Sequence, residues 1–505
     1  MNLHTSWTHP HPLQPRAAAP VTASSPAEYL LPEVHAEVRP LARAWLVIAM
    51  AALVGSGLYS VLLVLARTPA INAWLPAGDF FRVALVVHVD LSVLVWFTAI
   101  AAMLWALVQR PPVHRGHRLL AGAPVVLCGA GAATMALAAF VDPGTAVMAN
   151  YIPMLDSGTF RVALAMFGLG ALLLVLGGLV RARPVGAAVD GAGALRFGLN
   201  ASVVAAAVAL LAFGWSLAVV PTALPSKAYF EIAWWGGGHA LQFTWTLLML
   251  VGWLALAQAC GARVPLSPRV VLLLFAVALA SVFATPLAYL MHDVATVEHR
   301  NLHTWAMRFG GGVAIAPLAL AVLLALLQAR GTALTSEQRP LRAALTPEQR
   351  PLRAALTPEQ RPLRAALIAS MLLFVSGGLI GLTIGGSNVK IPAHYHGCIV
   401  GVTLALMGLV HLLLPRLGGR APQGRLAVLQ PWLYGGGQLL HIIGLVWSGG
   451  YGVQRKVAGS EQVLRSGAEV AGMGLMGVGG LLAIVGGLMF VVVVLRAIRP
   501  QGPRH

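Results

Sequence analysis

Long apolar segments alternate with short polar ones along most of this chain. Twelve apolar segments run for roughly 20 residues or more, the length that a helix needs to cross the hydrocarbon core of a bilayer. We place these predicted spans at residues 44–66, 82–108, 119–141, 160–180, 197–220, 229–258, 270–291, 303–329, 366–385, 393–415, 426–450 and 472–495. The pattern predicts an all-α polytopic membrane protein, a bundle of twelve transmembrane helices.

The composition supports this prediction and excludes other classes of protein. Of 505 residues, 58% are hydrophobic and only 10% are charged, too few to solvate the surface of a soluble protein of this length. A formal net charge of +18 would suggest nucleic-acid binding in a soluble protein. Here the basic residues lie between apolar segments, so they indicate membrane topology and no nucleic-acid partner. Cys128, Cys260 and Cys398 match no metal-binding spacing and no disulfide framework.

Arginine is concentrated in alternate loops, which sets the predicted orientation. The basic loops are RPPVHRGHR (110–118), RARPVGAAVDGAGALR (181–196), GARVPLSPR (261–269) and RLGGRAPQGR (416–425). By contrast, DPGTAVMANYIPMLDSGTF (142–160) has no basic residue before Arg161. Because basic loops stay on the cytoplasmic side, both termini are predicted to be cytoplasmic.

The first 43 residues form a polar, proline-rich lead rather than a signal peptide. We interpret residues 1–43 as a disordered cytoplasmic tail. A metal-binding tract through His4, His9 and His11 is the alternative.

An internal repeat interrupts the bundle, which is predicted over residues 44–497 and followed by a short tail, 498–505. ALTSEQRPLRA is followed by two copies of ALTPEQRPLRA across residues 333–365. The prolines within each unit oppose a continuous helix. We interpret the repeat as an expanded cytoplasmic loop, with a contact to lipid head groups or to a partner as the alternative.

Five histidines lie within the predicted spans or at their outer ends. They are His88, His239, His292, His394 and His396. Ionisable residues inside a membrane are costly and usually functional. At about 1.5 Å of helix rise per residue, all five fall in the outer part of the membrane. Their common depth favours a set of ligands over scattered core histidines.

The spacing in KIPAHYHGCIVG, residues 390–401, says how two of these histidines can act. Neighbouring residues of a helix are about 100° apart, so His394 and His396 point to opposite sides. They cannot bind one metal together, but they can serve two cofactors that flank the helix. Neutral imidazole in a dry apolar slot is a natural axial ligand of haem iron.

These features resemble subunit I of the haem–copper oxygen reductase superfamily, which also includes the nitric oxide reductases. The resemblance covers roughly residues 44–495 and implies the cytochrome oxidase subunit I fold, two haems and one nonhaem metal. In AHYHG it implies that His394 binds the high-spin haem and His396 the low-spin haem. In RVALVVHVD it implies that His88 is the second ligand of the low-spin haem.

The resemblance also implies the remaining site residues. WWGGGHALQF supplies His239 as a ligand of the nonhaem metal, and GGYGVQRKV supplies Arg455 and Lys456 near the haem propionates. The family ends its seventh helix with two metal-binding histidines. The corresponding residues in LMHDVATVEHRNLH are His292 and Asp293.

The chain departs from the family at two site positions. Phe243 stands where most oxygen reductases carry a tyrosine; Tyr289 is either a relocated counterpart or an ordinary packing residue. Asp293 replaces a histidine, and two histidines with a carboxylate suit iron better than copper. His299 or His303 could instead complete a three-histidine site.

The inner half of the bundle offers little for proton transfer. The eighth span contains no lysine, and the sixth offers only Thr244 and Thr246 below the metal-ligand position. We therefore predict a poor inner proton route. His411 and His441 lie too deep for the cluster and are interpreted as structural, or as solvated near the inner face.

Together these departures favour reduction of NO to N₂O over reduction of O₂ by a cytochrome c or quinol oxidase. Coupling two NO molecules needs two electrons and two protons, can use nonhaem iron, and does not require the tyrosine. Asp293 would then be a metal ligand, a proton donor or both.

The resemblance implies an oxidoreductase of a bacterial plasma membrane, embedded in lipid. Electrons would come from cytochrome c, a quinol or a small electron-entry subunit. They would pass through the low-spin haem to the high-spin haem and the nonhaem metal, iron or copper. A secondary transporter and a haem protein without catalytic activity are the rival hypotheses.

Overall fold

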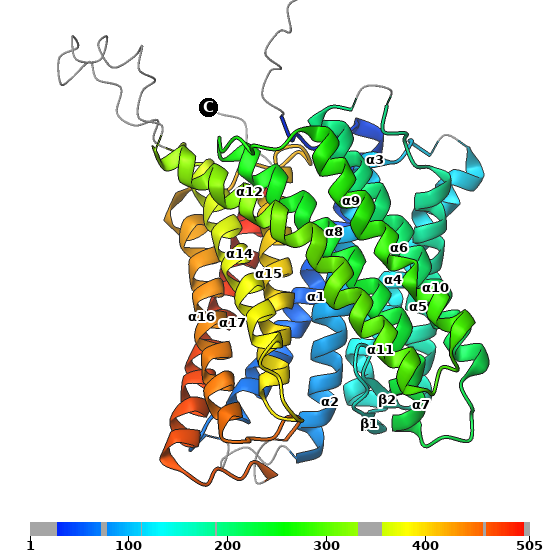
Figure 1. Cartoon of the computed structure of the whole chain (residues 1–505), viewed down its shortest axis with the longest axis vertical. Coiled ribbons are helices and arrows are strands. Elements are labelled where there is room, and N and C mark those ends of the chain that lie inside the picture. Colours follow the sequence, from blue (N-terminus) through cyan, green and yellow to red (C-terminus); the bar gives the residue numbers. More distant parts are fainter. Residues whose placement is uncertain are drawn as a thin grey trace, which may run out of the picture.

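The computed structural model describes residues 28–71, 78–112, 114–186, 189–331, 356–457 and 461–498. Within these ranges the chain is a bundle of long helices whose loops gather at two opposite ends (Figure 1). Eleven helices in the described ranges are long and apolar enough to cross a membrane. The predicted all-α polytopic membrane fold is therefore confirmed. Most of the two predicted tails lies outside the described residues, and so does the repeat up to residue 355.

The spans follow the predicted order. The first six are α1 (Arg39–Leu65), α2 (Gly78–Val89) continued by η3 (Asp90–Val95) and α3 (Trp96–Val108), α4 (Arg115–Val141), α5 (Gly158–Val180), α6 (Gly191–Val219) and α8 (Trp235–Ala259). The next six are α9 (Pro268–Val282) with α10 (Ala284–Met291), α11 (Val297–Trp305) with η4 (Ala306–Gly311) and α12 (Gly312–Gly331), α14 (Gln360–Gly381), α15 (Lys390–Leu413), α16 (Gly424–Gly450) and α17 (Gly467–Ile498). Shorter elements are η1 (Ala36–Val38), α7 (Ser226–Ala233), β1 (Thr145–Val147) and β2 (Met154–Asp156).

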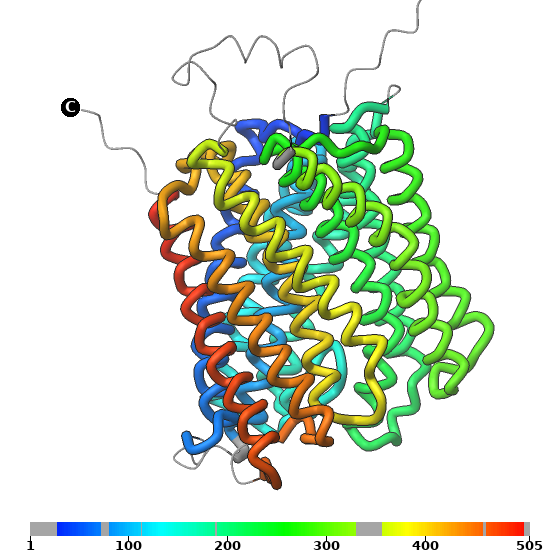
Figure 2. The backbone as a smooth tube through the Cα atoms, turned by 60° about the vertical axis from the view of Figure 1, so that its left-hand side comes forward, coloured from blue at the N-terminus to red at the C-terminus, as the bar shows by residue number. Residues whose placement is uncertain are grey.

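Helix α16 is the predicted span that is missing from the eleven. It is a continuous helix of 27 residues and lies beside α17 in Figures 1 and 2. It is less apolar than the other spans because it carries Gln430, Gln438 and His441. Counting α16, the described helices form the twelve spans that the sequence predicts. The start of α1 and the end of α17 lie towards the same end of the bundle (Figure 2).

Helix starts near the site follow ordinary capping chemistry. The Ser157 hydroxyl accepts the backbone N–H of Phe160 at the start of α5. The Thr296 hydroxyl accepts the N–H of His299 at the start of α11. Such side-chain caps satisfy N–H groups that have no partner within the helix. The second cap fixes where α11 begins and hence where its histidines lie.

Three spans form the interior of the bundle. In the most apolar stretch of α2–η3–α3, of α8 and of α15, between 78% and 89% of the residues are buried, against 28% to 50% in the other eight spans. These enclosed spans carry four of the five histidines that the sequence singles out. Lipid therefore surrounds the outer helices, whereas the histidine-bearing helices are surrounded by protein.

Two spans contain a π-helical segment close to a histidine. η3 begins two residues after His88, and η4 begins three residues after His303. π-helical turns within α-helices occur frequently at functional sites. Each therefore marks a stretch of helix that the surrounding protein holds away from regular geometry.

Glycines allow the helices around the histidines to approach closely. A Cβ on Gly377 of α14 would lie 2.4 Å from the backbone nitrogen of Cys398 on α15. A Cβ on Gly479 of α17 would lie 2.3 Å from the backbone nitrogen of His441 on α16. Small residues are typical of tightly packed transmembrane helices. Here they bring α14 to one side of α15 and hold α16 against α17.

Candidate functional site

The first histidine cluster joins α2, α15 and α16. The Nδ1 atom of His88 lies 3.0 Å from both the hydroxyl and the carbonyl oxygen of Ser56 on α1. The ring of His396 lies 4.7 Å, centroid to centroid, from the ring of His441, whose Nδ1–H donates to the Met476 carbonyl. His88 and His441 are both electrostatic neighbours of His396. The structure therefore brings the two predicted low-spin haem ligands into one buried region.

His441 was not expected in this cluster. Depth counted along the sequence placed it too far inside the membrane. His441 lies nine residues from the end of α16, whereas His396 lies six residues from the start of α15. At about 1.5 Å per residue the two depths differ by only about 5 Å. Counting residues from the ends of the two helices would therefore have predicted this contact.

His394 faces a different helix from its near neighbour. Its Nδ1–H donates to the carbonyl of Gly377 on α14, at 2.7 Å. A Cβ on Gly381 would lie 2.8 Å from that Nδ1 atom. The ring of His394 thus fits against a glycine face of α14, while His396 meets α16. Two cofactors on opposite sides of α15 are compatible with this arrangement.

The second histidine cluster contains His239 of α8 together with His299 and His303 of α11. The rings of His239 and His303 are 6.0 Å apart, and those of His299 and His303 are 4.6 Å apart. The Nδ1–H of His303 donates to the His299 carbonyl at 2.8 Å, and its Nε2 is buried without a hydrogen-bond partner. A buried nitrogen of this kind needs a metal, a water or a polar ligand.

The predicted ligands after the seventh span, His292 and Asp293, border the second cluster as electrostatic neighbours of His299. Asp293 is exposed, and its carboxylate accepts the backbone N–H of Ala295 at 2.9 Å. His292 is half-buried and ends α10. The ring in contact with His239 is that of His303 instead. Across the described residues, no three His, Cys, Asp or Glu side chains stand close enough to hold a metal ion.

Tyr151, in the turn between β1 and β2, contacts the same cluster. Its hydroxyl lies 2.8 Å from Nδ1 and 3.1 Å from Nε2 of His239. Its φ of +68° is unusual for a residue with a side chain and marks a constrained position. Burial raises the pKa of Tyr151 well above its ordinary value, so the phenol keeps its proton at neutral pH. No motif in the sequence pointed to this residue.

Tyr289 packs beside the histidines, but its hydroxyl forms hydrogen bonds with α6 instead. Its ring lies 4.7 Å from the ring of His299. Its hydroxyl lies 2.6 Å from the Ser216 hydroxyl and donates to the Ala212 carbonyl at 3.1 Å. This agrees better with a packing residue than with a relocated active-site tyrosine.

The three glycines that precede His239 leave room for the surrounding rings. A Cβ on Gly236 would lie 2.3 Å from the Tyr289 hydroxyl. A Cβ on Gly238 would lie 2.2 Å from the ring of Tyr151. A larger side chain at either position would displace one of these tyrosines. These two glycines thus leave room for Tyr289 beside His303 and for Tyr151 beside His239.

Basic residues lie near the histidine clusters, in the loops that follow α1 and α16. Lys456 has a φ of +64°, and its Nζ donates to the Met148 carbonyl at 2.6 Å. Burial lowers the pKa of Lys456 to about 8, and the charge of Arg455 adds to this effect. Arg67 is an electrostatic neighbour of His396 and His441, and burial lowers its pKa to about 10. Anionic groups are favoured beside these cations.

The orientation of the histidine rings suits haem iron. Six buried or half-buried histidines each direct Nδ1–H at a backbone carbonyl: His88, His239, His299, His303, His394 and His441. Such hydrogen bonds fix the tautomer in which Nε2 carries the free electron pair, as in metal-binding histidines. The enclosed apolar surroundings are those in which haem binds.

Two curated proteins are similar to this chain in sequence. No family model matches the sequence. The chain is 29% identical to an uncharacterized protein of Rickettsia prowazekii (strain Madrid E), over 90% of this chain and 95% of that protein. It is 24% identical to an uncharacterized protein of Aquifex aeolicus (strain VF5), over 77% of this chain and 88% of that protein.

A solved structure defines the class of fold. It is described as the cryo-EM structure of a heme-copper terminal oxidase dimer. Its TM-score to this chain is 0.70 at 16% sequence identity, and the match covers 93% of this chain and 86% of that chain. The chain therefore has the fold of a haem–copper terminal oxidase.

Proposed function

We propose that this protein is the catalytic subunit, subunit I, of a membrane respiratory reductase of the haem–copper type. One observation carries the proposal. The three most enclosed spans each bring at least one histidine to the interior, and His88, His239 and His394 each direct Nδ1 at a backbone carbonyl. A transporter would have no need for imidazoles prepared in this way, so it is the weaker hypothesis.

We assign the haem ligands as the sequence predicts them. His88 and His396 would hold the low-spin haem, and His394 the high-spin haem. Arg455 and Lys456 would face the haem propionates, and the position of Arg67 beside the first cluster supports the same role for it. When bound, the haems and the nonhaem metal supply one-electron transfers and the place where a diatomic gas is reduced.

The nonhaem metal has two candidate ligand sets that share His239. The sequence favours His292 and Asp293. The contacts of His239 favour His303 and His299 instead, because Asp293 is exposed and engaged in its own turn. We prefer the three-histidine set, which suits copper better than a set with a carboxylate. Its three side chains would have to move closer together to share one metal ion.

The geometry supports O₂ as the substrate. O₂ reduction takes four electrons and four protons, and a protonated phenol beside the metal-binding histidine can supply one of each. Tyr151 holds such a proton 3.1 Å from the Nε2 of His239. The enclosed helices exclude bulk water from this place.

NO reduction, which the sequence favours, is the second candidate. It is supported by Phe243, which is buried at the position where oxygen reductases carry their tyrosine. It is supported also by Thr244, whose hydroxyl is buried without a partner and leads to no lysine or carboxylate on α8. A reaction that consumes two protons makes fewer demands on such a route than one that consumes four.

The remaining expectations complete the proposal. Electrons would come from cytochrome c, a quinol or a small electron-entry subunit. The protein would lie in a bacterial plasma membrane with both termini cytoplasmic. A protein that binds haem through the same residues but has no catalytic activity is the remaining alternative.

Turnover of the two gases by one preparation tests the substrate. We expect the purified protein, with an artificial electron donor, to consume O₂, and we expect Tyr151→Phe to reduce that rate by about 10²-fold or more while retaining haem. His114→Ala, in an inner loop, is the control and should leave the rate unchanged. Formation of N₂O with a third iron per chain and no O₂ consumption would establish NO reduction instead. Haem bands without either activity would contradict both.

A further inference from the structure

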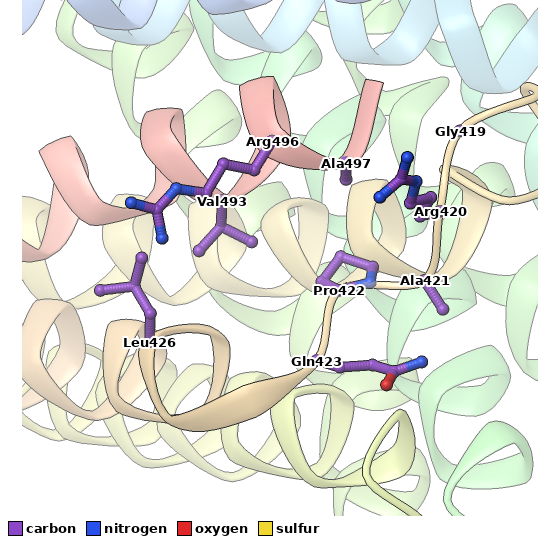
Figure 3. A pocket seen from close by; sticks show the side chains of 9 residues that line it. All are labelled: Gly419, Arg420, Ala421, Pro422, Gln423, Leu426, Val493, Arg496 and Ala497. Atoms are coloured by element: carbon purple, nitrogen blue, oxygen red, sulfur yellow. The ribbon is translucent and has the colours of Figure 1, made fainter. Parts of the chain in front are cut away.

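A cavity lies at the ends of α16 and α17, on the face that the basic loops mark as cytoplasmic. It has a volume of about 560 Å³. Its walls are the loop from Gly419 to Gln423, Leu426 in the first turn of α16, and Val493, Arg496 and Ala497 in the last turns of α17. Figure 3 shows Arg496 above Leu426 on one side and Arg420 beside Ala497 on the other. The cavity thus combines guanidinium groups with apolar walls.

The charge around this cavity has one sign. Arg420 and Arg496 line the cavity, and Arg416 and Arg425 lie in the same two chain segments, 413–426 and 490–498. The same segments contain no aspartate or glutamate. Arg496 has no ion pair or hydrogen bond within the described part of the chain. Like charges gathered around a cavity favour an anionic occupant, since an anion relieves their repulsion.

The cavity is held in shape by close backbone packing. The backbone N–H of Arg420 donates to the carbonyl of Ala497 at 2.8 Å. A Cβ on Gly419 would lie 2.8 Å from that carbonyl oxygen, so the loop touches the end of α17 directly. Gly418 has a φ of +84°, which turns the chain sharply away from α15. The loop is therefore fixed by the two helix ends.

The start of α16 adds to the attraction for an anion. Gln423 precedes this 27-residue helix and provides no side-chain cap. The first N–H groups of the helix thus lack the side-chain acceptor that usually satisfies them. Their partial positive charge reinforces the guanidinium groups that line the cavity.

We propose that this cavity binds the phosphate group of an anionic phospholipid. Arginine recognises phosphate through paired N–H donors. The lipid, rather than free phosphate, is favoured because the apolar wall continues along the same helices. Leu429, one turn after Leu426 on the same face of α16, exposes about half of its side chain and can accept an acyl chain. Basic pockets between transmembrane helices on the cytoplasmic side bind such head groups.

Lipid retention by the full-length protein tests the proposal. The protein is reconstituted with mixed phosphatidylglycerol and phosphatidylcholine, washed in detergent, and analysed by native mass spectrometry. We expect the double variant Arg420→Gln/Arg496→Gln to bind phosphatidylglycerol about 30-fold more weakly than the unmodified chain, from about fivefold per arginine. The matched control, Arg263→Gln/Arg269→Gln, removes two exposed arginines from another basic loop and should bind as before.

The other outcomes decide against the proposal. Equal phosphatidylglycerol binding by both double variants would overturn it. If inorganic phosphate displaces phosphatidylglycerol, or binds equally well without it, the site takes free phosphate and the lipid assignment fails. Neither result depends on haem, metal or gas turnover, so it leaves the proposed catalytic function untouched.

Discussion

In six histidines of the bundle, Nδ1–H lies against a backbone carbonyl of the protein. The contacts range from 2.7 Å at His394 to 3.3 Å at His299. The repeated use of Nδ1 leaves the Nε2 electron pair of these six rings directed away from the backbone, as metal-binding histidines require. At this scale the site is defined by ring orientation as much as by residue identity.

His303 and Asp293 separate the two candidate ligand sets of the nonhaem metal. We expect His303→Gln to lose the nonhaem metal, because its free Nε2 faces His239. We expect Asp293→Asn to retain it, because the Asp293 carboxylate is exposed. Metal per chain, measured by mass spectrometry on protein with unchanged haem content, checks both. Loss of the metal from Asp293→Asn alone would instead support His292 and Asp293 as its ligands, as the sequence favours.

Lys456 provides a pH dependence. Burial lowers its pKa to about 8 in the haem-free chain, below the ordinary value of about 10.4. A propionate beside it would favour the charged form and raise that pKa. Haem affinity is then highest below pH 8 and falls as the pH rises from about 8 towards 10. Transfer of haem to a scavenger protein at several pH values measures this dependence.

Substitution at the same position provides the control. Lys456→Met should bind haem more weakly below pH 8 and lose the pH dependence between about 8 and 10. Arg465→Met, which removes an exposed cation that is not among the electrostatic neighbours of Lys456, should keep it. If the Lys456→Met chain shows the same pH profile as the unmodified one, the amine does not face a propionate.

At the scale of single elements, α8 depends on its glycines. Gly238→Ala would place a Cβ 2.2 Å from the Tyr151 ring, and such overpacking costs about 1–3 kcal/mol. Gly214→Ala on α6 meets no atom within 4 Å and should stabilise the helix by up to about 1 kcal/mol. Thermal unfolding of the two variants in one detergent compares them. A Gly238→Ala chain as stable as Gly214→Ala would show that Tyr151 does not occupy this space.

The helices were predictable because the signal for membrane insertion lies within each apolar segment of the sequence. Each span needs a run of apolar residues, so the predicted segments correspond to helices even where η3 and η4 interrupt them. The spacing of His394 and His396 likewise fixes their opposite directions on α15. The π-helical segments were not predicted, since they depend on packing between helices and leave no periodic signal.

Much of the site depends on contacts between distant elements, which sequence spacing does not encode. Tyr151 reaches His239 from a turn 88 residues earlier. His441 contacts His396 because glycines hold α16 against α17 and because the two histidines lie at similar depths in the bundle. Asp293 aligned with a family ligand, yet the cap at Thr296 starts α11 at once and turns His299 inward. Such outcomes follow from tertiary packing.

At the scale of the whole molecule, the bundle separates two environments. Outer helices present leucine and valine to lipid, whereas α2–η3–α3, α8 and α15 are enclosed. An enclosed, apolar and histidine-lined interior excludes water from any reaction within it. The likeness to a haem–copper terminal oxidase extends over 93% of the chain, so this division belongs to the entire fold.

Haem content tests the central claim most directly. Protein purified from haem-replete cells should show a Soret band and about two haems per chain by pyridine haemochrome analysis. His396→Ala should lose the low-spin spectrum and keep the high-spin one, and His394→Ala the reverse. Colourless protein, or variants whose spectra match that of the unmodified chain, would contradict the assignment of α15 as the helix that holds both haems.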